Sequence, residues 1–124
     1  MNIVDSSIWL EYFTNTKRAA LFKELIEKSE ELLVPSITIY EVFKKVFRER
    51  GETNAVEAIE QMKEGKVVEL DDWMAILASK ISVGGKLGMA DSIIYATTLL
   101  YDATLWTQDS DFKDMRNVKY FPKD

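Results

Sequence analysis

The chain offers carboxylates, rather than imidazoles or thiols, as the groups that could do chemistry. Its 124 residues include 21 Asp and Glu but no His and no Cys. The absence of His excludes a Ser-His-Asp triad and a His-ligated metal. The absence of Cys excludes disulfides, thiol nucleophiles and zinc–thiolate sites. Catalysis must therefore use carboxylates, Lys, Tyr or hydroxyl groups, or a metal held by oxygen ligands, which favour Mg²⁺, Mn²⁺ or Ca²⁺.

Asp91 is the most informative of the acids. It lies in the segment 89–101, which is nearly all apolar and is predicted to form a buried helix. An isolated carboxylate is costly to bury unless it is paired or coordinates a cation. The alternative is a first-turn Asp favoured by the helix dipole, but this does not explain burial among Ile, Tyr and Ala. The functional interpretation is therefore favoured for Asp91.

Asp5 and Asp109 each follow a predicted strand, at 2–4 and 103–107. In an open parallel sheet, ligands bind outside the carboxyl ends of the strands. The two carboxylates would meet if these strands were neighbours, which the spacing alone does not decide. The alternatives are local: Asp5 can cap the next helix, and the pair Asp109 and Asp111 can cap a short turn. The same pair could also be oxygen ligands, although the spacing is not that of an EF-hand.

Glu41 lies in a predicted helix, on the stripe opposite its apolar face. Lys44, Lys45 and Arg48 share this stripe at i+3, i+4 and i+7. One interpretation is a solvated face with helix ion pairs. The other is an acid that faces a metal, with a basic track beside it for the phosphates of a nucleic acid. Lys80 and Lys86 are weaker candidates for phosphate contacts.

Short apolar runs alternate with amphipathic segments along the chain. This pattern predicts an α/β fold in which helices cover both faces of a parallel sheet. Strands are expected at 2–4, 32–34, 66–70, 103–107 and 118–121. Helices are expected at about 8–13, 18–29, 36–50, 53–64, 71–83 and 89–101. Ser36 is expected to cap its helix, and Gly51 to end it.

The helix expected at 71–83 should bury one apolar stripe, and the tryptophans are expected to pack inside the fold. The stripe consists of Trp73, Ile76, Leu77 and Ile81. Trp9 and Trp106 also fall at core-facing or strand positions, so all three Trp residues are interpreted as packing residues and not as stacking platforms for bases.

Length and composition predict one domain spanning 1–124, since 47% of the residues are apolar and the chain has only 5 Gly and 2 Pro. No apolar run approaches the length of a membrane span, and the start carries acids and lacks the basic region of a signal peptide. We therefore expect a cytoplasmic protein. Setting four site acids aside would bring the net charge of −5 close to balance, so nucleic acid remains an acceptable partner.

With these residues in view, the chain resembles the PIN-domain family, and within it the VapC-type toxins of prokaryotic toxin–antitoxin pairs. The resemblance spans essentially the whole chain and rests on four motifs in order: Ile3-Val4-Asp5-Ser6-Ser7, Pro35-Ser36 with Glu41, Gly88-Met89-Ala90-Asp91, and Thr107-Gln108-Asp109-Ser110-Asp111-Phe112. Ser6 stands where Thr is common in the family, and Gln108 stands where a basic residue or Asn is frequent.

The resemblance implies a three-layer α/β/α sandwich with five parallel strands in the order 3-2-1-4-5. It also implies an endoribonuclease that uses Mg²⁺ or Mn²⁺ and a metal-activated water to hydrolyse RNA, forms homodimers and is inhibited by a cognate antitoxin protein. The implied metal-binding and catalytic acids are Asp5, Glu41, Asp91 and Asp109, with Asp111 as a weaker fifth ligand. Ser6 and Thr107 are implied as polar support on the substrate side, together with the basic residues Lys44, Lys45 and Arg48.

Two other functions remain open from the sequence. A receiver-type signalling domain phosphorylated on Asp would also be about this long and Mg²⁺-dependent, with Thr107 and Lys119 in its conserved roles. It would, however, have adjacent acids after the first strand and no functional acid inside an apolar helix. The other alternative is a non-catalytic PIN-like module that only binds RNA or an antitoxin.

Overall fold

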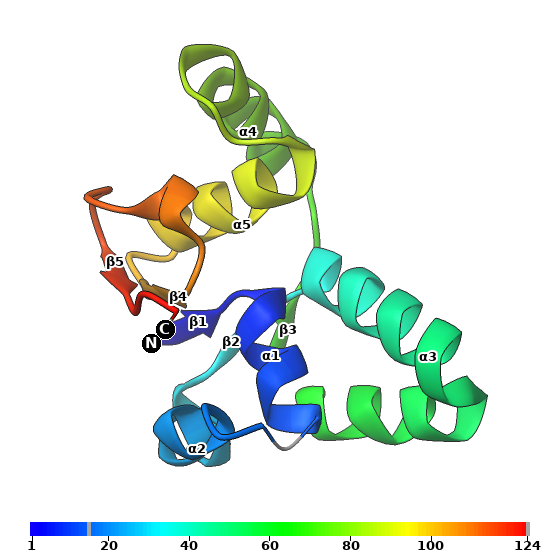
Figure 1. Cartoon of the computed structure of the whole chain (residues 1–124). Helices are drawn as coiled ribbons and strands as arrows, with labels where there is room; N and C mark the ends of the chain where they lie inside the picture. The colour runs from blue at the N-terminus through cyan, green and yellow to red at the C-terminus, as the bar shows by residue number, and fades with distance from the viewer. Residues whose placement is uncertain (15, 124) are drawn as a thin grey trace.

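The strands form at the predicted apolar runs and all pair in parallel. The structure is a computed structural model that describes residues 1–14 and 16–123. Its strands are β1 (Asn2–Val4), β2 (Leu33–Pro35), β3 (Lys66–Val68), β4 (Thr104–Thr107) and β5 (Val118–Tyr120). β1 pairs with β4 and β4 with β5, while β2 pairs with β3 (Figure 1). The adjacency of the first and fourth strands, which the family resemblance implied, is therefore present.

The strands make two hydrogen-bonded groups rather than one continuous ladder. Their orders are β1-β4-β5 and β2-β3, and a single parallel bridge between Asn2 and Leu32 lies between them. The neighbour relations within each group agree with the expected order. In the register of β1 and β4, Val4 lies opposite Trp106. The residues that follow them, Asp5 just after β1 and Thr107 at the end of β4, consequently lie side by side.

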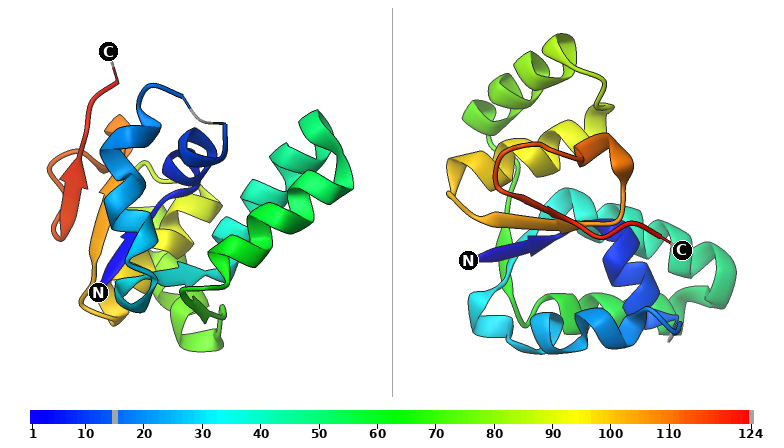
Figure 2. Two further views of the ribbon diagram at one scale, coloured as in Figure 1. Left: turned by 90° about the horizontal axis from the view of Figure 1, so that it is seen from below. Right: turned by 60° about the vertical axis from the view of Figure 1, so that its left-hand side comes forward.

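Helices cover the strands from two sides. They are α1 (Ser6–Phe13), α2 (Ala19–Glu27), α3 (Ser36–Met62), α4 (Asp72–Gly84) and α5 (Met89–Leu100), with short 3₁₀ turns η1 (Ser29–Glu31) and η2 (Ser110–Phe112). α4 and α5 lie on one side of the strands, and α1 and α2 on the other (Figures 1 and 2). This is the predicted three-layer α/β/α arrangement.

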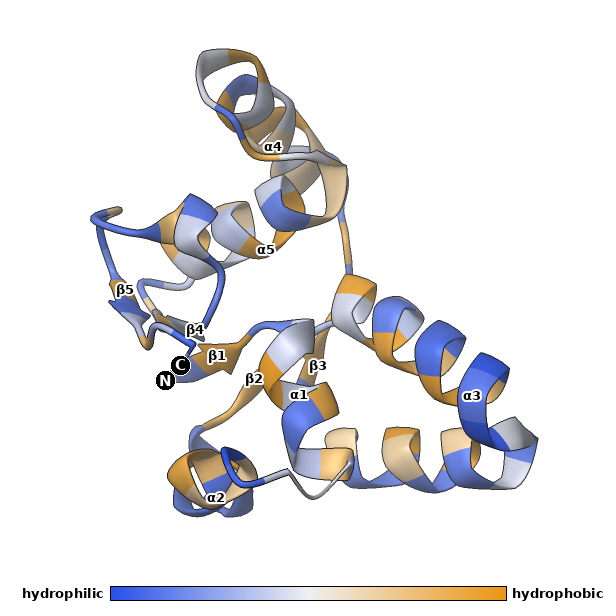
Figure 3. Ribbon diagram, viewed as in Figure 1, coloured by the Kyte–Doolittle hydropathy of each residue, from blue (hydrophilic) through white to orange (hydrophobic). Residues whose placement is uncertain are grey.

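Consecutive residues of one strand enter different hydrophobic cores. Ile3 and Leu33 pack with α4 and α5 in one core. Val4 and Val34 pack with α1, α2 and α3 in the other. Side chains alternate across a strand, so burial on both faces requires the continuous apolar runs that the sequence shows (Figure 3).

Gly51 ends the first of the two helices that make up α3, as predicted, and turns the chain into the second. Its φ of 85° is a left-handed conformation that glycine adopts without a steric penalty. The two arms of α3 fold back beside each other and project away from the strands (Figure 2). The prediction that Ser36 caps the N-terminus of this helix is wrong. Ser36 is the first helical residue, Pro35 occupies the cap position, and no side chain caps the helix there.

The predicted buried stripe of α4 is partly wrong. Trp73 is 73% exposed and Ile76 is 50% exposed, whereas Met74 and Ala78 are buried. Leu77 and Ile81, as predicted, pack partly against the core. Apolar side chains occur on two faces of this helix, so the hydrophobic pattern alone does not fix which face meets α5. In the part of the chain that the structure describes, no helix combines the length and hydrophobicity of a membrane span.

Candidate metal centre

Asp5 lies directly after β1, and its carboxylate is 4% exposed. Oδ1 of Asp5 accepts hydrogen bonds from the Ser7 hydroxyl at 2.7 Å and from the Ile8 backbone N–H at 3.3 Å. Oδ2 accepts a hydrogen bond from the Thr107 hydroxyl. Asp5 therefore caps α1, as the local interpretation predicted. It also faces the end of β4, as a site shared with Asp109 requires.

Thr107 connects Asp5 to the segment that carries the next acid. While its hydroxyl donates to Asp5, the same oxygen accepts a hydrogen bond from the Asp109 backbone N–H at 3.0 Å. Asp109 in turn caps η2, because its Oδ1 accepts from the Asp111 N–H at 2.9 Å. Phe112 is fully buried and packs near Tyr95 of α5, with 6.3 Å between the ring centroids. These contacts hold the η2 turn against α5.

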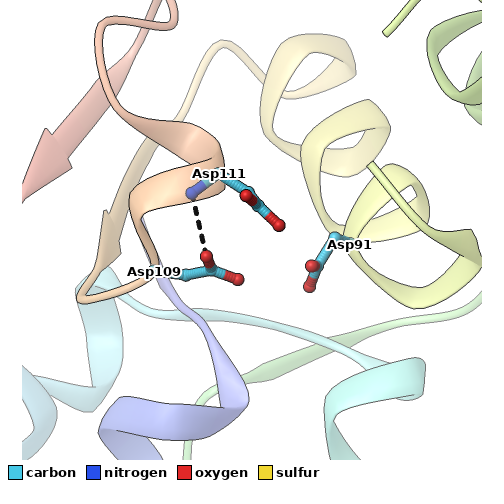
Figure 4. Close-up of side chains that lie close together, drawn as sticks. All are labelled: Asp91, Asp109 and Asp111. Atoms are coloured by element: carbon cyan, nitrogen blue, oxygen red, sulfur yellow. Dashed lines mark hydrogen bonds between the residues drawn. The ribbon is translucent and has the colours of Figure 1, made fainter. Parts of the chain in front are cut away.

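Asp91, Asp109 and Asp111 converge on one point. Each offers a carboxylate oxygen, and the three oxygens lie within 4.8 Å of one another. Figure 4 shows Asp91 pointing from the first turn of α5 toward the two acids of the η2 turn. We name these three residues the aspartate triad. Asp111, which was only a weaker fifth candidate from the sequence, thus belongs to the group of carboxylates that lie closest to one another.

Asp5 and Glu41 are outside the aspartate triad but close enough to interact with its charge. The Ser6 hydroxyl donates to Oε1 of Glu41 at 2.9 Å. Repulsion from Glu41 and Asp5 contributes to the raised pKa of Asp91. The chain therefore brings all five predicted acids into one region, with three in close contact and two at its edge.

Asp91 is harder to ionise than a free carboxyl. The pKa of Asp91 is raised from 3.8 to about 6, and burial is the largest cause. Negative charge on neighbouring carboxylates adds to this shift, from Asp109, Glu41, Asp5 and Asp111. The lysine nearest to the triad, Lys86, reaches Asp111 only at 4.0 Å and is largely exposed.

The pKa values of Asp5 and Glu41 are raised as well. Burial raises the pKa of Asp5, although hydrogen bonds from Thr107, Ser7 and Ile8 oppose the shift. Burial also raises the pKa of Glu41, and the Ser6 hydrogen bond opposes it. Asp5 is buried and Glu41 partly buried, and both lie beside the three carboxyls of the aspartate triad. Together the five acids create a strongly negative field.

A divalent cation fits this arrangement. The converging donors are all carboxylate oxygens, which are hard ligands that suit Mg²⁺ and Mn²⁺. The cation would offset the mutual repulsion that raises the pKa of Asp91. The donor chemistry and the electrostatics thus agree on a metal centre at the aspartate triad.

The predicted basic track lies beside Glu41. Lys44, Lys45 and Arg48 line a hollow of about 290 Å³ that Glu41 and Ser6 also line. Lys45 forms an exposed i,i+4 ion pair with Glu49 at 3.7 Å. The interpretation as a solvated face with helix ion pairs therefore holds for Lys45. All three cations nevertheless line the same hollow as Glu41.

Gln108 is a buried polar side chain that neighbours the acids. The Arg18 guanidinium donates to its Oε1. Its Nε2 has no hydrogen-bond partner among the described residues. Gln108 lines a small pocket together with Ser7 and Asp109. Sequence reasoning noted Gln108 only as a departure from the family pattern and gave it no role.

Several solved structures with a similar architecture are described as toxins or toxin–antitoxin complexes. A toxin–antitoxin complex from Klebsiella pneumoniae matches with a TM-score of 0.82 at 21% identity, over 99% of this chain and 100% of that chain. DNA-bound VapBC from Salmonella typhimurium matches with a TM-score of 0.77 at 15% identity, over 98% and 96% of the two chains. VapC20 from Mycobacterium tuberculosis, a toxin that cleaves the sarcin–ricin loop, matches with a TM-score of 0.74 at 17% identity, over 90% and 92%.

No curated protein sequence matches the chain. Lys119, which the receiver alternative would use, lies over the Trp106 ring, 4.9 Å from its centroid. The PIN domain model, in contrast, matches residues 3–118 and therefore nearly the whole chain. By this match the chain belongs to the PIN-domain family.

Proposed function

We propose that this protein is a Mg²⁺- or Mn²⁺-dependent endoribonuclease and the toxin of a VapBC-type toxin–antitoxin pair, with residues 1–124 acting as one domain. The observation that carries the proposal is the convergence of the aspartate triad, from α5 and from the turn after β4, next to the buried Asp5. Membership of the PIN family and the likeness to VapC toxins support this choice over a module that only binds.

Asp91, Asp109 and Asp111 would hold the cation, with Asp5 and Glu41 at the edge of the centre. When bound, Mg²⁺ or Mn²⁺ activates a water for attack and polarises the scissile phosphodiester. The chain itself keeps the carboxylates in place. Thr107 fixes one oxygen of Asp5, and Ser6 fixes one oxygen of Glu41, so neither carboxylate has to be ordered when substrate arrives.

Substrate affinity would come mainly from phosphate contacts. Lys44, Lys45 and Arg48 stand on one helix stripe beside Glu41, so a phosphate backbone that follows them is led to the acids.

The proposed protein partners are a cognate antitoxin and a second copy of the chain. A mostly apolar groove of about 450 Å³ between α4 and the start of α5 supports a protein contact, since Leu70, Val83 and Met89 line it and are all exposed. We assign this groove, which we name the α4 groove, to the homodimer.

The test of the proposed function is cleavage of a panel of RNAs that includes structured tRNA and single-stranded messages. We expect cleavage with Mg²⁺ or Mn²⁺, none in EDTA, and none by the folded variant Asp5→Asn. Cleavage that persists in EDTA or in Asp5→Asn would contradict the proposed site. A wild-type protein that binds RNA but cleaves no member of the panel would instead favour a non-catalytic binding module.

A further inference from the structure

Tyr40 presents an aromatic ring to solvent immediately before Glu41 on α3. Its side chain is 58% exposed. It lines the same hollow of about 290 Å³ as Ser6, Glu41 and Lys44. A large ring at this exposure contributes little to the core, so its position beside the acids calls for a different explanation.

Three cations lie near the ring, in the hollow that Glu41 also lines. The Lys44 ammonium lies 5.6 Å from the ring centroid, one helical turn after Tyr40. Lys45 and Arg48 line the same hollow. The hollow therefore combines a flat aromatic face, cations for phosphate groups and, at its edge, an acid of the candidate metal centre.

These features match the parts of one unpaired nucleotide. A base stacks on an aromatic face, and the phosphates on either side of it bind Lys or Arg. A base inside a continuous duplex is already stacked on its neighbours and does not reach a protein ring without unstacking. We propose that Tyr40 stacks on an unpaired base next to the phosphodiester that is hydrolysed at the candidate metal centre, an inference that rests on the proposed ribonuclease function.

Trp73, the most exposed tryptophan, does not fit this role. It is 73% exposed, but it lies at the start of α4 directly after Asp71 and Asp72. Two adjacent carboxylates repel the phosphate backbone that would have to run beside a stacked base. Exposure of an aromatic ring is thus not enough to predict base stacking. The basic residues around Tyr40 distinguish it from Trp73.

The chain offers a matched control in Tyr101. This tyrosine is also exposed, at 44%, and also has a lysine over its ring, with Lys66 Nζ 6.0 Å from the centroid. It lies just beyond the C-terminal end of α5, whereas Asp91 is in the first turn of that helix. Tyr101 is ten residues after Asp91, which corresponds to about 15 Å along the helix axis.

The test measures RNA binding in EDTA, where no cleavage occurs, by fluorescence anisotropy of two labelled probes. One probe is an RNA hairpin with a single-stranded loop, and the other is a fully paired RNA duplex of the same length. We expect Tyr40→Ala to weaken binding of the hairpin about 10-fold, within the range reported for loss of one stacked base, and to leave duplex binding unchanged. Tyr40→Phe keeps the ring and should bind like the wild type, and so should Tyr101→Ala.

Equal hairpin affinity of Tyr40→Ala and the wild type would overturn the inference, and so would equal weakening for both probes, which would indicate a general effect on charge or on α3. Failure of Tyr40→Phe to retain binding would also overturn it. If the wild type bound neither probe, the proposed function would fail together with this inference. If the wild type bound and cleaved RNA while Tyr40→Ala bound the hairpin normally, only the stacking role would fail.

Discussion

The Thr107 hydroxyl donates a hydrogen bond to Oδ2 of Asp5, across 102 residues of sequence. The parallel register of β1 and β4 makes this contact possible, because it sets Val4 opposite Trp106. Since the Thr107 oxygen also accepts from the Asp109 backbone, one hydroxyl links the ends of both strands to the acids that follow them. The pairing of two short strands is thus what brings the ends of the chain together at the candidate metal centre.

Removal of this hydroxyl should destabilise the fold. In Thr107→Val a buried carboxylate loses a donor and the Asp109 N–H loses an acceptor. We expect the free energy of unfolding to fall by about 1–3 kcal/mol in urea denaturation. The control is Thr98→Val, because the buried Thr98 hydroxyl donates only to the Ile94 carbonyl within α5. Equal losses in the two variants would contradict a special role for the contact between Thr107 and Asp5.

Asp91→Asn should stabilise the metal-free protein at neutral pH. The pKa of Asp91 is about 6 in the folded chain against 3.8 for a free carboxyl, so the folded state binds the proton more tightly. Stability therefore falls as the pH rises from about 4 to 6, and above that range ionised Asp91 costs about 1–2 kcal/mol after allowance for solvent screening.

The measurement for this prediction is thermal unfolding in EDTA between pH 4 and 8. Asp91→Asn should lack the loss of stability that the wild type shows over that range. Asp72→Asn is the matched control, because Asp72 is the first-turn acid of α4 as Asp91 is of α5. A lower melting temperature for Asp91→Asn than for the wild type at pH 7 would show that repulsion does not dominate at this position.

Mn²⁺ should raise the melting temperature by binding the aspartate triad. At about 100 times the dissociation constant, a ligand of the folded state adds about 2.7 kcal/mol, or about 8–15 °C for a chain of this size. Asp109→Asn and Asp111→Asn should each remove most of the increase. Asp114→Asn should not, because Asp114 is exposed and its φ of 66° suits Asn. A full Mn²⁺ response in Asp111→Asn would exclude Asp111 as a ligand.

The basic track should control the salt dependence of RNA binding. The double variant Lys44→Ala, Lys45→Ala removes two of the three cations beside Glu41. We expect weaker binding and a salt slope flatter by about 1.4, as two lost phosphate contacts on single-stranded RNA predict. The control is Lys23→Ala, Lys28→Ala, with Lys23 on α2 and Lys28 at its C-terminal end, since Lys28 is in an exposed i,i+4 ion pair with Glu24 as Lys45 is with Glu49. Identical slopes for both double variants would identify the track as a solvated face only.

The α4 groove should mediate the homodimer. Val83 is 90% exposed in the single chain, so Val83→Glu should leave the fold intact while placing a charge in the interface. Light scattering after size exclusion should give a dimer for the wild type and a monomer for Val83→Glu. Leu21→Glu, on the exposed face of α2, should remain a dimer. A wild type that is monomeric at all concentrations tested would contradict this assignment.

The acids and strands could be found from sequence because their signals are local. Asp5 follows a short apolar run, and Asp91 interrupts an apolar helix, so each stands out without knowledge of the fold. The adjacency of β1 and β4 is not local, and only the family resemblance supplied it. The closeness of Asp111 to Asp91 was also not predictable from spacing, because it depends on how buried Phe112 holds the η2 turn against α5.

Helix orientation was the least predictable property. The α4 segment carries apolar residues on two faces, and packing against α5 selected Met74 and Ala78 while leaving Trp73 exposed. Likewise, Gly51 predicts the end of one helix, but no local feature of the sequence predicts that the second arm of α3 returns beside the first (Figure 1). Both features are set by tertiary contacts between distant segments.

The most direct test of the central claim is RNA cleavage with Mn²⁺ by Asp91→Asn, because this variant is expected to fold at least as stably as the wild type. Its loss of activity would then reflect the metal centre and not unfolding. We predict at least about 100-fold slower cleavage than the wild type, since the lost metal assistance is worth several kcal/mol, and an unchanged rate for Asp72→Asn. Cleavage by Asp91→Asn at the wild-type rate would contradict the account.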